Sequence, residues 1–265
     1  MTNTDTTKPE TTESSPKPAA LKPVGRERAA RGRRQPGGTV LGLAFDGSLM
    51  QAVLVRRTNG SAEICKKVSA PLSLNLLTDD PALVGREIQK HLAAAGIRER
   101  VCVVGLPLNW VLTFSTKLPD LPEPDLASFL QIEAERGFPY APDALMLARS
   151  RYRTPAGEPY VLQVAVPREH VTRLEAVLKA AQLRPASFSL CISGLQCPDG
   201  ETTTGVIALL PGERSVGMQI CCGGGIAVLR TIEGASELQG AGDGRFQIDQ
   251  LTRELRITLG QLPTD

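Results

Sequence analysis

The chain has few of the residues on which metal binding and proton transfer usually depend. Among its 265 residues are two histidines, His91 and His170, and six cysteines. No two cysteines have the CxxC spacing of a metal or redox site, and no histidine pair lies near them. Both histidines fall in segments of helical spacing, where a place on the helix surface is the simpler interpretation than a general base. The sequence therefore predicts no metal site.

Long apolar runs are absent as well. No segment approaches the roughly 20 apolar residues that a membrane-spanning helix requires. Residues 1–5 are Met-Thr-Asn-Thr-Asp, which lack the basic and then apolar pattern of a signal peptide. We therefore expect a soluble, cytoplasmic protein that contacts a membrane only through a partner or through its basic tail.

Residues 1–38 contain no isoleucine and no aromatic residue. Such a segment cannot bury enough apolar surface to offset the entropy of ordering, so we expect a disordered tail. Its net charge is +4, which leaves the rest of the chain near −2 because the whole chain is +2. The basic cluster at residues 26–34 could contact anionic lipid or nucleic acid, but we favour a solubilising linker. The remaining sequence has no pattern for specific nucleic-acid binding.

One pattern occurs twice in the chain. A three-strand meander covers residues 41–68 and turns at Asn59-Gly60. A second meander covers residues 205–231 and turns at residues 223–225, which are all glycine. Asn-Gly and Gly-Gly between alternating apolar segments are typical of β-hairpins. The repeat predicts two related halves that face each other across a cleft.

Other segments alternate between helical and strand periodicity, which indicates a mixed α/β fold. Helices are expected where apolar residues recur every three to four positions, and strands where they alternate or form short runs. The predicted helices cover residues 79–96, 125–136, 167–181 and 246–259, and the further strands cover 101–106, 110–118, 145–153, 160–166 and 188–192.

Several motifs in the middle of the chain resemble the PilM family of type IV pilus assembly proteins. Residues 106–107 are Leu-Pro, residues 117–119 are Lys-Leu-Pro, and residues 129–139 read Phe-Leu-Gln-Ile-Glu-Ala-Glu-Arg-Gly-Phe-Pro. They are similar to a family pattern of a strand ending in Leu-Pro, a helix with Glu-Ala-x-Arg, and a proline just beyond. The resemblance spans about residues 39–260. Further matching segments lie at residues 42–48, 160–168, 181–185, 230–234 and 254–259.

The resemblance implies an actin-like fold of two ribonuclease-H-like lobes with an inserted small α/β subdomain. We accordingly predict a tail at 1–38, a first lobe at 39–106, an inserted subdomain at 107–165 and a second, shortened lobe at 166–265. Family members bind ATP in the cleft between the lobes. They also hold the cytoplasmic N-terminal peptide of the inner-membrane protein PilN beside the inserted subdomain. The cytoplasmic region of GspL is a relative.

The two first strands lack the acids that nucleotide chemistry requires. An ATPase of this fold needs a carboxylate at the first strand of each lobe, because Mg²⁺ prefers hard oxygen ligands. When Gly42 is aligned with the family, Ala44 stands at the first position, and Leu209 and Leu210 stand at the second. The glycine turn at residues 223–225 lies between strands, so it lacks the helix N-terminus of a phosphate site.

A displaced acid follows the first of these positions. Asp46 lies two residues beyond it, and only a shifted loop would bring its carboxylate to the cleft; a corner at Asp46, Gly47 and Ser48 is the simpler interpretation. The family's later Gly-Gly loop, which contacts the adenosine, is also missing before Asp265. We expect a degenerate nucleotide loop at residues 46–48, no catalytic residue, no required cofactor, and neither hydrolysis nor strong binding of ATP with magnesium.

The expected function is a non-catalytic scaffold in the assembly platform of a type IV pilus or type II secretion-like system, peripheral at the inner membrane. The expected partner is the N-terminal peptide of a PilN-like protein, which could add to a sheet edge; other platform proteins are further candidates. For Trp110 we favour the alternative that it belongs to the small core of the inserted subdomain. The candidates for the partner groove are Trp110, Leu112, Phe114, Leu118, Glu133 and Arg136.

Two other classes of function remain open on the sequence. An active actin-like ATPase or sugar-kinase-type enzyme would bind MgATP in the cleft, but the missing acids argue against it. A polymerising actin-like protein would share the fold, but the motifs at residues 106–139 favour the pilus branch.

Overall fold

The computed structural model describes residues 38–58, 61–195, 205–239 and 243–263. The predicted tail lies outside these ranges except for residue 38, and the predicted turn at Asn59-Gly60 lies outside them as well. The account below concerns the described residues.

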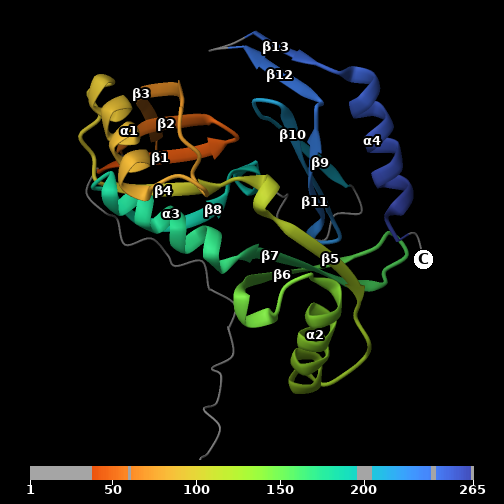
Figure 1. Ribbon diagram of the computed structural model, residues 1–265. Helices are drawn as coiled ribbons and strands as arrows, with labels where there is room; N and C mark the ends of the chain where they lie inside the picture. Colours follow the sequence, from red (N-terminus) through yellow and green to blue (C-terminus); the bar gives the residue numbers. More distant parts are fainter. Residues whose placement is uncertain (1–37, 59–60, 196–204, 240–242, 264–265) are drawn as a thin grey trace, which may run out of the picture. The chain divides into compact units, whose positions relative to one another are not determined.

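The first meander forms one side of a five-stranded sheet in the order β3-β2-β1-β4-β8 (Figure 1). Neighbouring strands of the meander are antiparallel, whereas β4 is parallel to β1 and β8 is parallel to β4. The mixed α/β fold expected from the sequence is thereby confirmed. The strands are β1 (Thr39–Asp46), β2 (Leu49–Thr58), β3 (Ser61–Pro71), β4 (Val101–Leu106) and β8 (Arg184–Leu190).

Two helices cover one face of this sheet. Helix α1 (Pro81–Ala94) begins where the Asp80 side chain accepts hydrogen bonds from two backbone N–H groups, as an N-cap should. It packs against α3 (Arg168–Ala180) with little space between the helices, since a Cβ on Gly85 would lie 2.6 Å from that of Ala180. The buried residues of both helices meet those of the strands in the largest core cluster, which includes Leu41, Leu43, Phe45, Val84, Ile88, Val104, Leu174 and Val177.

The first sheet extends past residue 166, where the sequence analysis had ended the inserted subdomain and begun the second lobe. Both elements belong to the first sheet and its helical layer, although the sequence had placed them in the second lobe. The reason is that β8 pairs in parallel with β4, and parallel strands need a crossover, which is usually a helix. Helix α3 completes that crossover after the small sheet described below.

The second meander forms a three-stranded sheet in the order β11-β10-β9, as the repeat predicted. Helix α4 (Ile248–Gln261) packs on it through Leu251 and Leu255, and its Glu254 forms an ion pair of 2.9 Å with Arg230. The predicted start of this helix at Phe246 is wrong, because that residue ends a short strand. The elements before α4 are β9 (Val206–Pro211), β10 (Ser215–Cys222), β11 (Gly225–Glu233), β12 (Ser236–Gln239) and β13 (Asp243–Phe246).

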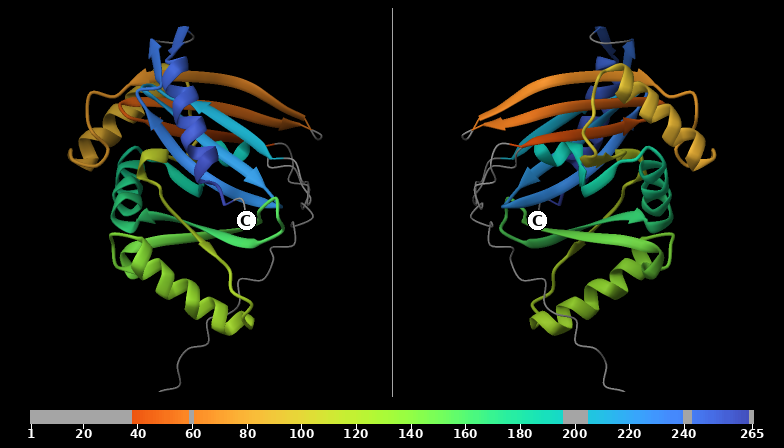
Figure 2. Two further views of the ribbon diagram at one scale, coloured as in Figure 1. Left: turned by 90° about the vertical axis from the view of Figure 1, so that its right-hand side faces the viewer. Right: turned by 90° about the vertical axis from the view of Figure 1, so that its left-hand side faces the viewer.

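The residues between the two meanders include a third sheet in the order β5-β7-β6, with α2 (Glu123–Gly137) on one face (Figure 2). Its other face packs against β11 through Tyr152, Leu162 and their neighbours. Helix α2 begins after Pro122, so Asp125 stands in its first turn instead of capping it as expected. The strands are β5 (Leu112–Lys117), β6 (Leu145–Arg153) and β7 (Pro159–Pro167).

In the described part of the chain, no helix combines the length and the apolar character that crossing a membrane would take.

Candidate functional site

The corners of the two meanders touch each other. The backbone N–H and the hydroxyl of Ser48 donate to the carboxylate of Glu213, both at 3.2 Å. In return, the backbone N–H of Glu213 donates to the carboxylate of Asp46. We call this set, Asp46 to Ser48 with Gly212 and Glu213, the corner contact. It joins the β1–β2 turn to the β9–β10 turn across 165 residues of sequence.

Small residues allow the corner contact to form. Gly47 has a φ of 56°, and a Cβ there would lie 3.1 Å from a carboxylate oxygen of Glu213. A Cβ on Gly212 would overlap the carboxylate of Asp46. Asp46 to Ser48 therefore form the tight turn that the sequence predicts, and the turn is held against the second sheet.

The space behind the corner contact is small. Its volume is about 100 Å³, whereas small-molecule sites usually have about 300–1,000 Å³. Asp46 is the one carboxylate among the described residues that line it, and its oxygen already accepts the Glu213 N–H. Ala44 and Leu210, the positions at which the sequence analysis expects acids in an ATPase of this fold, line the same space. The volume of this cavity is thus below the usual range for a small-molecule site, and the one carboxylate among its described lining residues already holds a backbone N–H.

Burial changes the chemistry of Asp46. Removal from water raises the pKa of its carboxyl, the hydrogen bond from the Glu213 backbone opposes that rise, and the nearby charge of Glu213 adds to it. The net result is a pKa above the ordinary value. The folded protein thus binds a proton at Asp46 more readily than the unfolded chain does, and ionisation of this carboxyl weakens the fold.

We expect Asp46→Asn to be more stable than the natural protein at pH 7. Asparagine keeps an oxygen for the Glu213 N–H but carries no charge, so the variant avoids the loss of stability that sets in as pH rises above about 3.9. The difference should shrink as pH falls towards that value. Urea unfolding of both proteins at pH 7 and pH 4 measures it; a less stable variant at pH 7 would contradict this account.

The structure buries Trp110 in the main core beside the first sheet and α3, and not in the small core of the inserted subdomain that the favoured alternative gave it. The residue is 9% exposed and meets His170 edge to face, with ring centroids 5.2 Å apart. It ends a short 3₁₀ helix, Leu108–Trp110, instead of starting the predicted 110–118 strand. Trp110 is therefore removed from the predicted partner groove.

Leu112 and Phe114 pack beneath α2. Both contact the cluster of Ala134, Phe138 and Leu145, and the Phe114 ring lies 6.3 Å from that of Phe138. A Cβ on Gly137 would lie 2.5 Å from the Phe114 ring. These two predicted groove residues therefore pack in the interior between the small sheet and α2.

Of the remaining groove candidates, Glu133 and Arg136 pair on the surface, and Leu118 lines a groove. Glu133 and Arg136 form an ion pair of 3.5 Å with the arginine side chain 75% exposed, and such a pair adds little stability. Leu118 lines a groove of about 500 Å³ at the end of β5. The other lining residues are Lys117, Pro119, Asp120, Leu126, Glu158 and Pro159.

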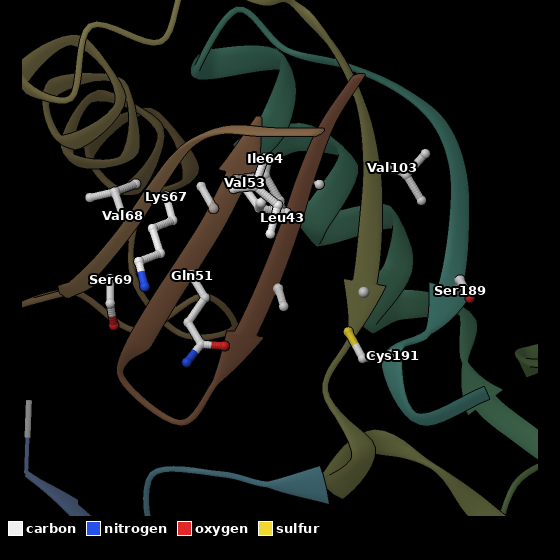
Figure 3. A pocket seen from close by; sticks show the side chains of 14 residues that line it. Leu43, Gln51, Val53, Ile64, Lys67, Val68, Ser69, Val103, Ser189 and Cys191 are labelled. Atoms are coloured by element: carbon white, nitrogen blue, oxygen red, sulfur yellow. The ribbon is translucent and has the colours of Figure 1, made fainter. Parts of the chain in front are cut away.

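A larger hollow, not foreseen from the sequence, lies on the first sheet (Figure 3). It has a volume of about 730 Å³ and opens on the face opposite α1 and α3. Apolar residues line most of it, with Gln51, Lys67 and Ser69 at one side and Ser189 and Cys191 at the other. The available signal was that β1 and β4 carry apolar or small residues at both odd and even positions.

No group of three or more His, Cys, Asp or Glu that could hold a metal ion occurs among the described residues. Burial raises the pKa of the Cys102 thiol to about 11, so this cysteine is an unreactive core residue. Cys197 lies outside the described ranges.

Comparison with known proteins identifies the fold. No family model matches the chain, and no curated protein does. A chain of the PilM–PilN type IV pilus biogenesis complex is 22% identical, with a TM-score of 0.58 over 75% of this chain and 63% of that one. The cytoplasmic domain of EpsL, an inner membrane component of the type II secretion system of Vibrio cholerae, is 12% identical, with a TM-score of 0.51 over 74% of this chain and 71% of that one.

This chain thus spans less than two thirds of the matched pilus protein, and the likeness at such identities concerns the fold. The architecture predicted from the motifs at residues 106–139 is confirmed at that level. The chain has the actin-like α/β fold of these two proteins of pilus and secretion systems.

Proposed function

We propose that this protein is a non-catalytic scaffold in the assembly platform of a type IV pilus or type II secretion-like system. The observation that carries the proposal is the closed corner contact, which leaves about 100 Å³ where a nucleotide would have to bind. The shared fold with a chain of the PilM–PilN complex supports the choice of system. A protein with this cleft acts by holding partners, not by turning over ATP.

The partner in this proposal is the cytoplasmic N-terminal peptide of a PilN-like membrane protein. Strand β5 is the edge of the β5-β7-β6 sheet and pairs only with β7 among the described strands. An extended peptide can add to such an edge through main-chain hydrogen bonds, while neighbouring grooves select its side chains. The groove at Leu118 and Leu126 lies where β5 ends, so it can hold one apolar side chain of the added peptide.

This arrangement gives the protein its place in the cell. Binding to the cytoplasmic peptide of a membrane protein holds the scaffold at the inner membrane. Other platform proteins, and lipid contacts by the basic tail, belong to the same proposal.

We expect Leu118→Ala to weaken binding of that peptide about tenfold or more, because the change removes the apolar wall of the groove. The assay is fluorescence anisotropy with a labelled N-terminal cytoplasmic peptide of a PilN-like protein from the same organism. Leu121→Ala is the matched control, since Leu121 is 42% exposed and does not line the groove.

Two results would refute the binding site. One is equal affinity of Leu118→Ala and the natural protein, with Leu118→Ala shown to be folded by circular dichroism. The other is equal loss in both variants, which would mean that the groove has no special part in binding. A peptide that fails to bind the natural protein refutes the proposed partner itself.

A further inference from the structure

Basic side chains gather at one end of the first sheet. Thr39 at the start of β1 pairs with Arg56 near the end of β2. Val101 at the start of β4 pairs with Arg184 at the start of β8. Because neighbouring strands lie about 4.8 Å apart, Arg56 and Arg184 are separated by roughly 15 Å along this end. We define the basic end as the lysine and arginine residues of the segments that meet here, which are Arg56, Arg57, Arg98, Arg100, Lys179 and Arg184.

Few acids offset the charges of the basic end. In the described parts of these segments the acids are Glu63 and Glu99, and Glu99 already accepts a hydrogen bond from the hydroxyl of the first β1 residue. Within the described ranges, the exposed side chains of Arg57, Arg98 and Arg184 take part in no ion pair. These three guanidinium groups can therefore bind an anion from outside the chain.

Arg100 is held in place at the same end. Its Nη1 donates to the backbone carbonyl of Gln182 at 3.4 Å and also to the side-chain oxygen of that residue. Gln182 has a φ of 59° and follows the end of α3, at a position where glycine is usual. A residue without the conformational freedom of glycine thus stands there, and its side chain orients Arg100.

A hollow of about 420 Å³ adjoins the basic end. Arg98, Glu99 and Arg100 line it on one side. Apolar surface next to guanidinium groups suits an anionic amphiphile, whose phosphate pairs with arginine while its carbon atoms contact the apolar wall. That wall consists of Leu92, Ile97, Ala181 and Leu183.

The basic cluster of the tail directly precedes this end in the sequence. Arg33 and Arg34 stand six and five residues before Thr39. At no more than about 3.6 Å per residue, the chain cannot carry Arg34 further than about 18 Å from the start of β1. The cluster at residues 26–34 is thus tethered to a surface of its own sign. An anionic surface would bind both at once.

We propose that the basic end and the arginine cluster of the tail together bind a bilayer surface rich in anionic phospholipid. Arginines spread over such a distance match an array of lipid phosphates, and the planar guanidinium binds phosphate with two hydrogen bonds. Nucleic acid is disfavoured because neither these segments nor residues 1–38 contain an aromatic residue on which bases would stack. A second copy of the chain would bring like charges together, which is repulsive.

The test is co-sedimentation of the full chain with vesicles of phosphatidylcholine alone, or with about a third of the lipid replaced by phosphatidylglycerol. We expect binding to the anionic vesicles only, and weaker binding as the salt concentration rises. Arg57→Gln, Arg98→Gln and Arg184→Gln together should weaken binding about tenfold or more. This triple variant should fold, because the three side chains are exposed and form no ion pair among the described residues.

The matched control removes the same charge from other surfaces. Arg214→Gln, Arg253→Gln and Arg256→Gln change exposed residues of the second meander and α4, and this variant should bind as the natural protein does. A second background separates the folded end from the tail. When the five arginines of residues 26–34 are changed to glutamine, the triple variant should still bind more weakly than its parent.

The basic end differs from the groove at Leu118, and the vesicles carry no PilN-like peptide, so this proposal and the proposed function can fail separately. The proposal is overturned if the triple variant binds as well as its matched control, or if neutral vesicles bind equally. Displacement by inorganic phosphate at constant ionic strength also overturns it, since the site would then hold a single phosphate. So does tighter binding to a duplex DNA fragment than to vesicles, if the triple variant loses it.

Discussion

Trp110→Ala is expected to lower the free energy of unfolding by about 3–5 kcal/mol, the usual cost of removing a large aromatic side chain from a core. Trp110 is 9% exposed, belongs to the main cluster, and lies edge to face with His170. Its replacement leaves a cavity between β4, α3 and the start of the small sheet. Urea unfolding followed by circular dichroism measures the loss, since the chain has no other tryptophan for fluorescence.

Tyr140→Ala is the comparison for this change, because Tyr140 is 45% exposed. It should alter stability by less than about 0.5 kcal/mol, as surface substitutions usually do. If Trp110→Ala were equally mild, Trp110 would not be a core residue, and its original place among the partner-groove candidates would have to be restored.

Gly225→Ala is expected to cost about 3 kcal/mol, since overpacking against a rigid neighbour is among the severe substitutions. A Cβ at this position would overlap the carbonyl oxygen of Arg151 and lie 3.0 Å from the Ser150 hydroxyl. Those atoms belong to β6, and the Ser150 hydroxyl accepts the backbone N–H of Ile226 at 2.8 Å. The added methyl group therefore separates the β10–β11 turn from the small sheet.

The neighbouring Gly224 separates this steric effect from backbone strain. Gly224 has a φ of 83°, and a Cβ there would meet nothing within 4 Å. Gly224→Ala should thus cost only the strain of a left-handed residue, about 1 kcal/mol. Urea unfolding of both variants tests the contrast, and an equal loss in the two would mean that the turn does not pack closely on β6.

Much of the fold can be predicted from local sequence patterns. Alternating residues and the glycine turn predict the second meander, and apolar spacing with the Asp80 cap predicts α1. The three-residue 3₁₀ helix ending at Trp110 is too short to produce a periodic signal. The sheet to which β8 belongs is set by long-range pairing with β4, which no local pattern contains.

The candidate site is also predictable only where local sequence patterns determine it. The turn at Asp46 to Ser48 follows from its residue types, but its partner Glu213 lies 165 residues beyond Ser48 in a turn without a distinctive motif. The outer face of the first sheet had a readable signal, because β4 reads Val-Cys-Val-Val-Gly-Leu with no polar position for solvent. Such a strand is typical of a sheet covered on both sides.

The central claim, that the cleft no longer serves a nucleotide, is tested most directly by isothermal titration calorimetry of the full chain with MgATP. The corner contact between Ser48 and Glu213 and the cavity of about 100 Å³ behind it predict no measurable binding heat up to millimolar nucleotide. A saturable heat with a dissociation constant in the low micromolar range would contradict the account and restore the ATPase alternative.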